Sequence, residues 1–211
     1  MRIPIAKEGY PFIMGSALPA LFLAFVGAYI SAACLLAICG FCVFFFRDPE
    51  RSVPREGSAI LSPADGKVLA IETMGDDRNI GRRAVKISIF MSVFNVHVNR
   101  SPLSARLVER RYVPGRFISA FKDKSSHLNE RNHLLLETTE GTRIMVTQVA
   151  GIIARRIVCR AREGDVLETG ARFGLIRFGS RLEVVLPDDV DLAVQRGQKV
   201  TAGRTILGHM R

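Results

Sequence analysis

The chain has 211 residues, of which 48% are hydrophobic and 24% charged, and its formal net charge is +10. This length allows one domain with an appendage, and the four cysteines, which form neither a CxxC pair nor zinc-ligand spacing, favour neither a disulfide framework nor a metal site. The basic charge suits an anionic lipid surface better than nucleic acid, because no Lys/Arg-rich run with interleaved aromatic residues is present.

Residues 9–46 contain no charged side chain. One straight helix over this stretch would be about 57 Å long, nearly twice the roughly 30 Å hydrocarbon core of a membrane. The stretch therefore predicts either two helical segments with a break near Gly27 or one span with an interfacial lead-in. Basic residues flank both ends, which favours a hairpin at the cytoplasmic face of the cell membrane. A signal peptide is the alternative, but the apolar run is long for one.

A polar, proline-rich linker follows at residues 47–57, so we expect a membrane-associated helical segment at 1–46 and a β-rich domain at 58–211. The domain is a succession of short β-prone runs with Gly, Pro, Asp or Asn between most of them. Such spacing predicts a mainly β domain of sandwich or barrel type. We expect strands at 59–61, 67–72, 84–91, 105–112, 133–138, 143–149, 155–159, 175–178 and 181–186, with two more in the tail at 196–208.

Two stretches of this domain echo each other, SPADGKVLAIE at 62–72 and EGDVLETGARFGLIRFGSRLEVVLP at 163–187 followed by the tail. These turn-strand-turn units resemble the flattened barrel-sandwich hybrid of biotinyl and lipoyl carrier domains. In those carriers an exposed hairpin bears a modifiable lysine. The comparable hairpin here carries Gly179 and Ser180 and no lysine, which disfavours a carrier function.

Three residues are candidates for chemistry: Asp65 in the SPADG turn, His97 in SVFNVHVNRSP, and Ser180 after Gly179. Each has an ordinary structural explanation as well. Asp-Gly and Gly-Ser pairs are common in turns, and a lone histidine in an apolar strand is more often a packed residue than a catalyst. Three further histidines have weaker cases, namely His127, His133 and His209.

The order of the motifs is more specific than any one of them. It runs from IPIAKEGYPF through FRDPER, SPADGKV, the His97 stretch and NERN to FGS near the C-terminus. Over essentially the whole chain this order resembles the phosphatidylserine decarboxylase proenzymes of the short bacterial and archaeal type. The resemblance implies self-cleavage between Gly179 and Ser180, which gives a long chain, 1–179, and a short chain, 180–211, that stay tightly associated.

The resemblance also implies the cofactor and the reaction. Ser180 becomes a covalent pyruvoyl group, which forms a Schiff base with membrane phosphatidylserine and leads to phosphatidylethanolamine and CO2. Longer members of the family have an Asp-His-Ser arrangement for cleavage and a second histidine for decarboxylation. Asp65 and Ser180 match, and His97 matches the first of the two histidines, but Arg100 stands at the second. Either His97 serves both steps or Asp65 works with another partner; we expect His97 to matter most for decarboxylation and Asp65 for cleavage.

Two other functions remain open from the sequence. A membrane-anchored, carrier-like β-sandwich adaptor without enzymatic activity would stay a single chain of 211 residues. A pyruvoyl decarboxylase of a soluble amino acid would have no reason to keep an apolar segment. A homo-oligomer is compatible with the sequence, and nucleic acid is not an expected partner.

Overall fold

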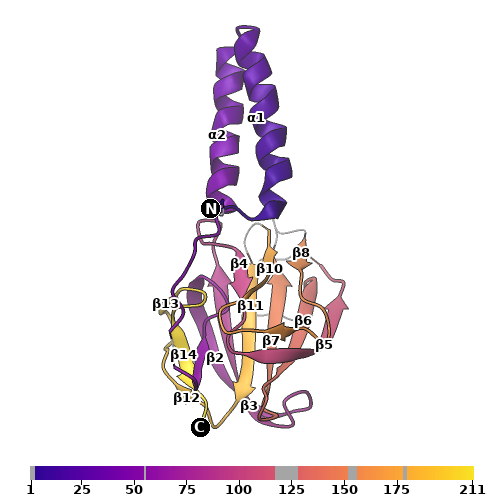
Figure 1. Ribbon diagram of the computed structural model, residues 1–211, viewed down its shortest axis with the longest axis vertical. Helices are drawn as coiled ribbons and strands as arrows, with labels where there is room; N and C mark the ends of the chain where they lie inside the picture. The colour runs from indigo at the N-terminus through magenta and orange to yellow at the C-terminus, as the bar shows by residue number, and fades with distance from the viewer. Residues whose placement is uncertain (1–2, 55, 117–127, 152–155, 178–179) are drawn as a thin grey trace. The chain divides into compact units, whose positions relative to one another are not determined.

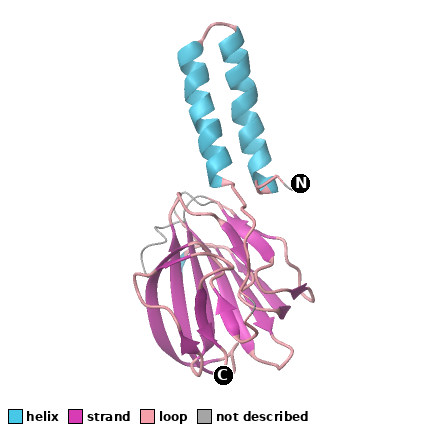
Figure 2. Ribbon diagram, turned by 60° about the vertical axis from the view of Figure 1, so that its left-hand side comes forward, coloured by secondary structure: helices cyan, strands magenta, loops and turns pink. Residues whose placement is uncertain are grey.

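The computed structural model describes residues 3–54, 56–116, 128–151, 156–177 and 180–211. The chain divides into two compact units, Met1–Glu50 and Arg51–Arg211. The first unit is helical and the second is built from β-sheets, as Figures 1 and 2 show. The chain is therefore mainly β with a helical N-terminal segment, as the sequence predicts.

The N-terminal unit is a helical hairpin. A single 3-10 turn, η1 (Lys7–Gly9), leads into α1 (Tyr10–Phe25), and α2 (Tyr29–Phe45) returns beside it. Gly27 connects the two helices with a φ of +83°, a left-handed conformation that glycine adopts without steric cost. The break thus lies where the sequence predicts it.

The hairpin exposes large apolar side chains. Phe22, Phe25 and Ile30 are 64%, 88% and 84% exposed. Covering such surface with hydrocarbon is favourable, at about 25 cal/mol per Å² removed from water. Among the described residues, Lys7–Phe25 is the one helix that is long and apolar enough to cross a membrane, and α2 is shorter. These features make the hairpin a candidate membrane segment.

In the second unit the described residues form three antiparallel sheets. The largest has eight strands in the order β13-β2-β3-β11-β7-β6-β5-β9, and it curls on itself in Figure 2. Two three-stranded sheets, β1-β14-β12 and β4-β10-β8, complete the unit. The strand bounds are β1 Ala59–Leu61, β2 Gly66–Asp77, β3 Arg82–Met91, β4 Val98–Arg100, β5 Ala105–Val113, β6 Arg131–Glu137, β7 Arg143–Ala150, β8 Ile157–Cys159, β9 Val166–Leu167, β10 Arg172–Ile176, β11 Ser180–Pro187, β12 Asp191–Leu192, β13 Lys199–Val200 and β14 Ile206–His209.

Most of these strands coincide with the predicted runs. The structure adds β4, β9 and β12, which are too short to carry an alternating pattern, and it extends β2 to Asp77. The prediction for 175–178 falls partly on residues 178–179, which lie outside the described residues.

The core lies on one face of the eight-stranded sheet. Alternate residues of the central strands meet there, including Ile87, Ile89 and Met91 of β3 and Leu182 and Val184 of β11. This alternation follows from the two-residue period of a strand.

The alternation of polar and apolar residues at 181–186 predicts a half-buried strand, but all eight residues of β11 are buried. Arg181 and Glu183 are 3% and 7% exposed, and their side chains lie 3.5 Å apart as an ion pair. The pairing lets two charged residues occupy a covered face of a central strand.

Candidate active site

Ser180 is the first residue of β11, in the middle of the large sheet. It pairs with Met91 of β3 on one side and with Ala150 of β7 on the other. The residue is fully buried, and its hydroxyl donates to the Met91 sulfur at 3.4 Å. Because a thioether is a weak acceptor, this bond leaves the hydroxyl oxygen chemically available in a dry environment. Phe178 and Gly179, the other residues of the predicted cleavage motif, lie outside the described residues.

His97 is buried just before β4, and its backbone is linked to the surroundings of Ser180. Its carbonyl accepts a hydrogen bond from Ile176 N at 3.4 Å. Ile176 packs against Ala150, the strand partner of Ser180. The fold thus connects His97 to Ser180 at the start of β11 through Ile176 and Ala150.

The tautomer of His97 follows from its contact with Asn95. The ring Nδ1 lies 2.9 Å from the Asn95 carbonyl oxygen. A carbonyl only accepts hydrogen bonds, so Nδ1 carries a proton. In the neutral ring Nε2 is then the basic nitrogen, which is the form required of a general base.

Asp65 lies in the turn between β1 and β2 and is held by Arg51. The two carboxylate oxygens accept from the Arg51 guanidinium at 2.5 and 2.8 Å, and Ala202 N donates to Oδ1 at 2.8 Å. Both side chains are largely buried, at 7% and 14% exposure. Within the described residues the hydrogen bonds of this carboxylate therefore go to an arginine and a backbone amide rather than to a histidine.

Arg100 joins the Asp65 turn to the His97 stretch. Its backbone N–H donates to the Pro63 carbonyl at 2.9 Å, and its guanidinium donates to the Gly170 carbonyl at 3.1 Å. The side chain is buried. The structure thus brings the segments of Asp65 and His97 side by side, although no described bond joins their side chains.

A chain of buried amides, not anticipated from the sequence, crosses the interior beside Ser180. Gln148 Nε2 donates to Asn99 Oδ1 at 2.9 Å, and Asn132 Nδ2 donates to Gln148 Oε1 at 3.0 Å. Arg110 Nε donates to Asn132 Oδ1 at 3.3 Å. The three amide residues are fully buried.

The arginine fixes the direction of this amide chain. A guanidinium only donates, so each amide must accept on the arginine side and donate on the other. The last member, Asn99, therefore presents its NH2 group to the Met91 sulfur at 3.8 Å. The same sulfur accepts from the Ser180 hydroxyl. The Asn99 amide is thus a hydrogen-bond donor of fixed orientation next to the candidate nucleophile. In the sequence, only its position two residues after His97 could have indicated that it belongs to the site.

The other candidate groups have structural partners. His133 Nδ1 lies 2.9 Å from Thr147 Oγ1, and burial, together with Arg111 and Arg131, lowers the pKa of His133 to about 4. His209 pairs with Glu56. His127 lies outside the described residues. Burial raises the pKa of the Cys159 thiol, which keeps it protonated.

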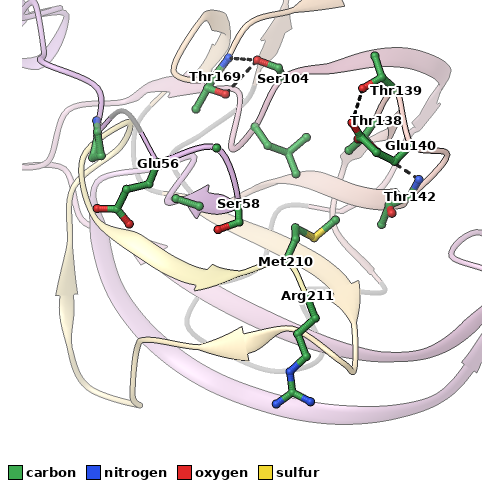
Figure 3. A pocket seen from close by; sticks show the side chains of 14 residues that line it. Glu56, Ser58, Ser104, Thr138, Thr139, Glu140, Thr142, Thr169, Met210 and Arg211 are labelled. Carbon is green, nitrogen blue, oxygen red and sulfur yellow. Dashed lines mark hydrogen bonds between the residues drawn. The ribbon is translucent and has the colours of Figure 1, made fainter.

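A pocket of about 650 Å³ lies away from the candidate site. Figure 3 shows that hydroxyl groups from Ser104, Thr169 and the hairpin between β6 and β7 line it, and that these groups bond to neighbours. That hairpin follows Glu137 and precedes Arg143, at the opposite end of β7 from Ala150. Seven residues of strand correspond to about 24 Å. A second pocket, of about 480 Å³, includes Asp65 in its lining and so lies beside the candidate site.

The chain is similar in sequence to known proteins. The sequence model of the phosphatidylserine decarboxylase family matches residues 38–208. The phosphatidylserine decarboxylase proenzyme of Geotalea uraniireducens (strain Rf4) is 49% identical over 205 residues, which cover 97% of this chain and 96% of the relative. The proenzyme of Geobacter metallireducens (strain ATCC 53774 / DSM 7210 / GS-15) is 48% identical over 210 residues, with 97% and 96% covered. That of Symbiobacterium thermophilum (strain DSM 24528 / JCM 14929 / IAM 14863 / T) is 46% identical over 211 residues, with 100% and 98% covered.

Proposed function

The chain belongs to the phosphatidylserine decarboxylase family and is a decarboxylase, and from that premise we propose that it is a proenzyme that cuts itself between residues 179 and 180. Ser180 then becomes a covalent pyruvoyl group, and the mature enzyme converts phosphatidylserine to phosphatidylethanolamine and CO2. The observation that carries this proposal is the buried Ser180 hydroxyl at the start of a central strand, bonded to a sulfur rather than to a strong acceptor.

Self-cleavage begins with an acyl shift. The Ser180 oxygen attacks the carbonyl carbon of residue 179, the peptide C–N bond breaks, and an ester and a free amine result. Removal of the Ser180 α-proton then breaks the Cβ–Oγ bond, and the electron pair leaves with the carboxylate of residue 179. The remaining dehydroalanine tautomerises, takes up water and loses ammonia, which leaves a carbonyl at residue 180. A serine hydroxyl needs a nearby base for the first step.

His97 is the group that we propose for proton transfer. Its Nδ1 is occupied by the Asn95 carbonyl, so its other nitrogen is the one suited to accept and return a proton. Asp65 has a positioning role in this proposal. Through Arg51 and Ala202 it fixes the turn that accepts the Arg100 N–H, and thereby holds the strand that begins just after His97.

The finished group would supply an electron-accepting carbonyl for the substrate amine, a chemistry that no side chain offers. The surroundings of Ser180 suit such a group, because the site is dry and Asn99 presents an N–H donor next to it. The short chain, 180–211, would stay associated with the long one through strand pairing. Its strands β11, β13 and β14 pair with β3, β2 and β1 of the long chain.

We also propose that residues 1–46 anchor the enzyme to the cytoplasmic face of the cell membrane, with 47–57 as the linker to the catalytic domain. Arg47, two residues after the end of α2, supports this orientation. Its guanidinium carbon lies 3.9 Å from the centre of the Phe44 ring, and its Nη1 donates to the Phe44 carbonyl at 2.7 Å. A basic residue at the end of an apolar helix is typical of the cytoplasmic side.

The mass of the purified protein under denaturing conditions tests the proposal. The unmodified sequence should give two chains that meet at 179/180, the short one beginning with a pyruvoyl group in place of serine. Ser180→Ala should give a single inactive chain, and normal cleavage of this variant would exclude the mechanism. His97→Ala and Asp65→Ala, scored for cleavage and for CO2 release, assign the two roles; a His97→Ala enzyme that is normal in both would remove His97 from the site.

A further inference from the structure

A pocket of about 480 Å³ lies beside the candidate active site, and none of the steps proposed above uses it to bind a ligand. Three of its lining residues connect it to that site. Asp65 belongs to the site itself, Ser92 follows the methionine that contacts the Ser180 hydroxyl, and the Asn95 carbonyl bonds to His97. The pocket therefore adjoins the place where a substrate amine would react.

Two lysines give this pocket an unusual charge. Lys67 of β2 and Lys199 of β13 are direct partners in the antiparallel pairing, and both line the pocket. Like charges placed opposite each other on a sheet are destabilising. Across the ranges that the structure describes, neither ammonium group has an ion-pair partner. Both lysines are exposed, so the pair places two positive charges on the lining of one open pocket.

Neither edge protection nor a neighbouring carboxylate accounts for both lysines. Lysine on an edge strand prevents unwanted strand pairing, which accounts for Lys199 on β13 but not for Lys67, whose strand lies between β13 and β3. The one carboxylate in the lining is Asp65, and its charge is already matched by Arg51. An anion from outside the chain would complete the pocket.

We propose that the Lys67–Lys199 pocket binds the phosphodiester of the phospholipid substrate. This inference rests on the proposed function, since phosphatidylserine carries one phosphodiester only a few bonds from its amine. Lysine is a common ligand of phosphate, and two ammonium groups suit a group with one negative charge shared by two oxygens. The pocket would hold the head group and leave the amine to reach residue 180.

The test uses full-length protein in nonionic micelles, with Lys67→Gln, Lys199→Gln and the double variant. Glycerophosphoserine, the deacylated head group, is titrated into Ser180→Ala protein, where binding can be measured without cleavage or turnover. The double variant should bind it at least about tenfold more weakly. Lys86→Gln is the matched control, because Lys86 lies on the same sheet but pairs with Glu72 at 2.9 Å, and its affinity should not change. Equal affinity in the double variant and the control would overturn the proposal.

Kinetic measurements distinguish binding of the substrate's phosphate from binding of the membrane surface. With cleaved enzyme and monomeric short-chain phosphatidylserine, the double variant should raise KM about tenfold or more and change kcat little. If KM changes only on anionic vesicles, the lysines bind the bilayer and the proposal is wrong. If the proposed function is wrong, the unmodified chain remains uncut. Glycerophosphoserine binding to the Ser180→Ala protein still tests the two lysines in that case.

Discussion

Gln148→Met should strongly destabilise the protein, because it removes the central member of the buried amide chain. The substitution keeps the length and flexibility of the side chain, so the cavity contribution is small. It leaves Asn99 Oδ1 and Asn132 Nδ2 without their partners at 2.9 and 3.0 Å, and all three residues are fully buried. An orphaned buried polar group costs about 1–3 kcal/mol, so the free energy of unfolding should fall by about 2–6 kcal/mol. A domain of this kind has roughly 5–15 kcal/mol in total.

Urea unfolding of full-length Ser180→Ala protein, with and without Gln148→Met, measures this loss on a chain that remains covalently intact. Gln195→Met is the matched control, because Gln195 is exposed and its substitution should change the unfolding free energy by less than about 0.5 kcal/mol. A loss below about 1 kcal/mol for Gln148→Met would refute the reasoning, since water or another group would then satisfy the two amides. In protein with Ser180 intact, Gln148→Met should also slow self-cleavage, because Asn99 loses the bond that orients it.

Three further predictions concern other parts of the chain. Arg51→Met should lower the unfolding free energy by about 3–5 kcal/mol, because it leaves the Asp65 carboxylate buried without its ion pair, and adding Asp65→Asn should restore part of the loss in the same urea assay. The free energy of unfolding should fall as the pH drops from about 6.5 to 4, because the pKa of His133 is lowered to about 4 in the folded chain and is near 6.5 in the unfolded chain, which therefore binds the proton first. After allowance for solvent screening the loss is roughly 1–2 kcal/mol. An unchanged pH profile in His133→Gln would contradict this prediction. Deleting residues 1–46 should leave a β domain that cleaves itself but acts poorly on vesicles, and full activity on vesicle-embedded substrate would exclude the anchoring role.

Local patterns predicted the elements of this fold. The glycine break in the apolar stretch and the β-prone runs are properties of neighbouring residues, and the structure reproduces both at Gly27 and in the central strands. Burial of Arg181 and Glu183 was not predictable, because a strand's own alternation does not reveal whether both faces of its sheet are covered. Strand type is thus encoded locally, whereas strand position within the sheet is not.

The candidate site divides in the same way. Ser180, His97 and Asp65 could be named from motif order, but their hydrogen-bond partners could not. Arg51 binds Asp65 from the linker, and Gln148 bonds to Asn99 across 49 positions of sequence. Such partners depend on how the sheet closes, and no spacing rule connects them. The like-charged pair of Lys67 and Lys199 is also invisible until the register of β13 against β2 is known.

Ser180 lies at the start of a strand, a position at which the proposed cut would leave the site ordered. β11 pairs with β3 from Ser180 to Pro187 and with β7 from Ser180 to Val185. A cut before Ser180 removes none of these pairs, so the new terminus stays between two strands that hold it. A cut inside the strand would let paired backbone groups separate, and buried N–H and C=O groups without partners cost free energy. The proposed self-processing at the first residue of a central strand would therefore create a chain end and keep that end ordered for catalysis.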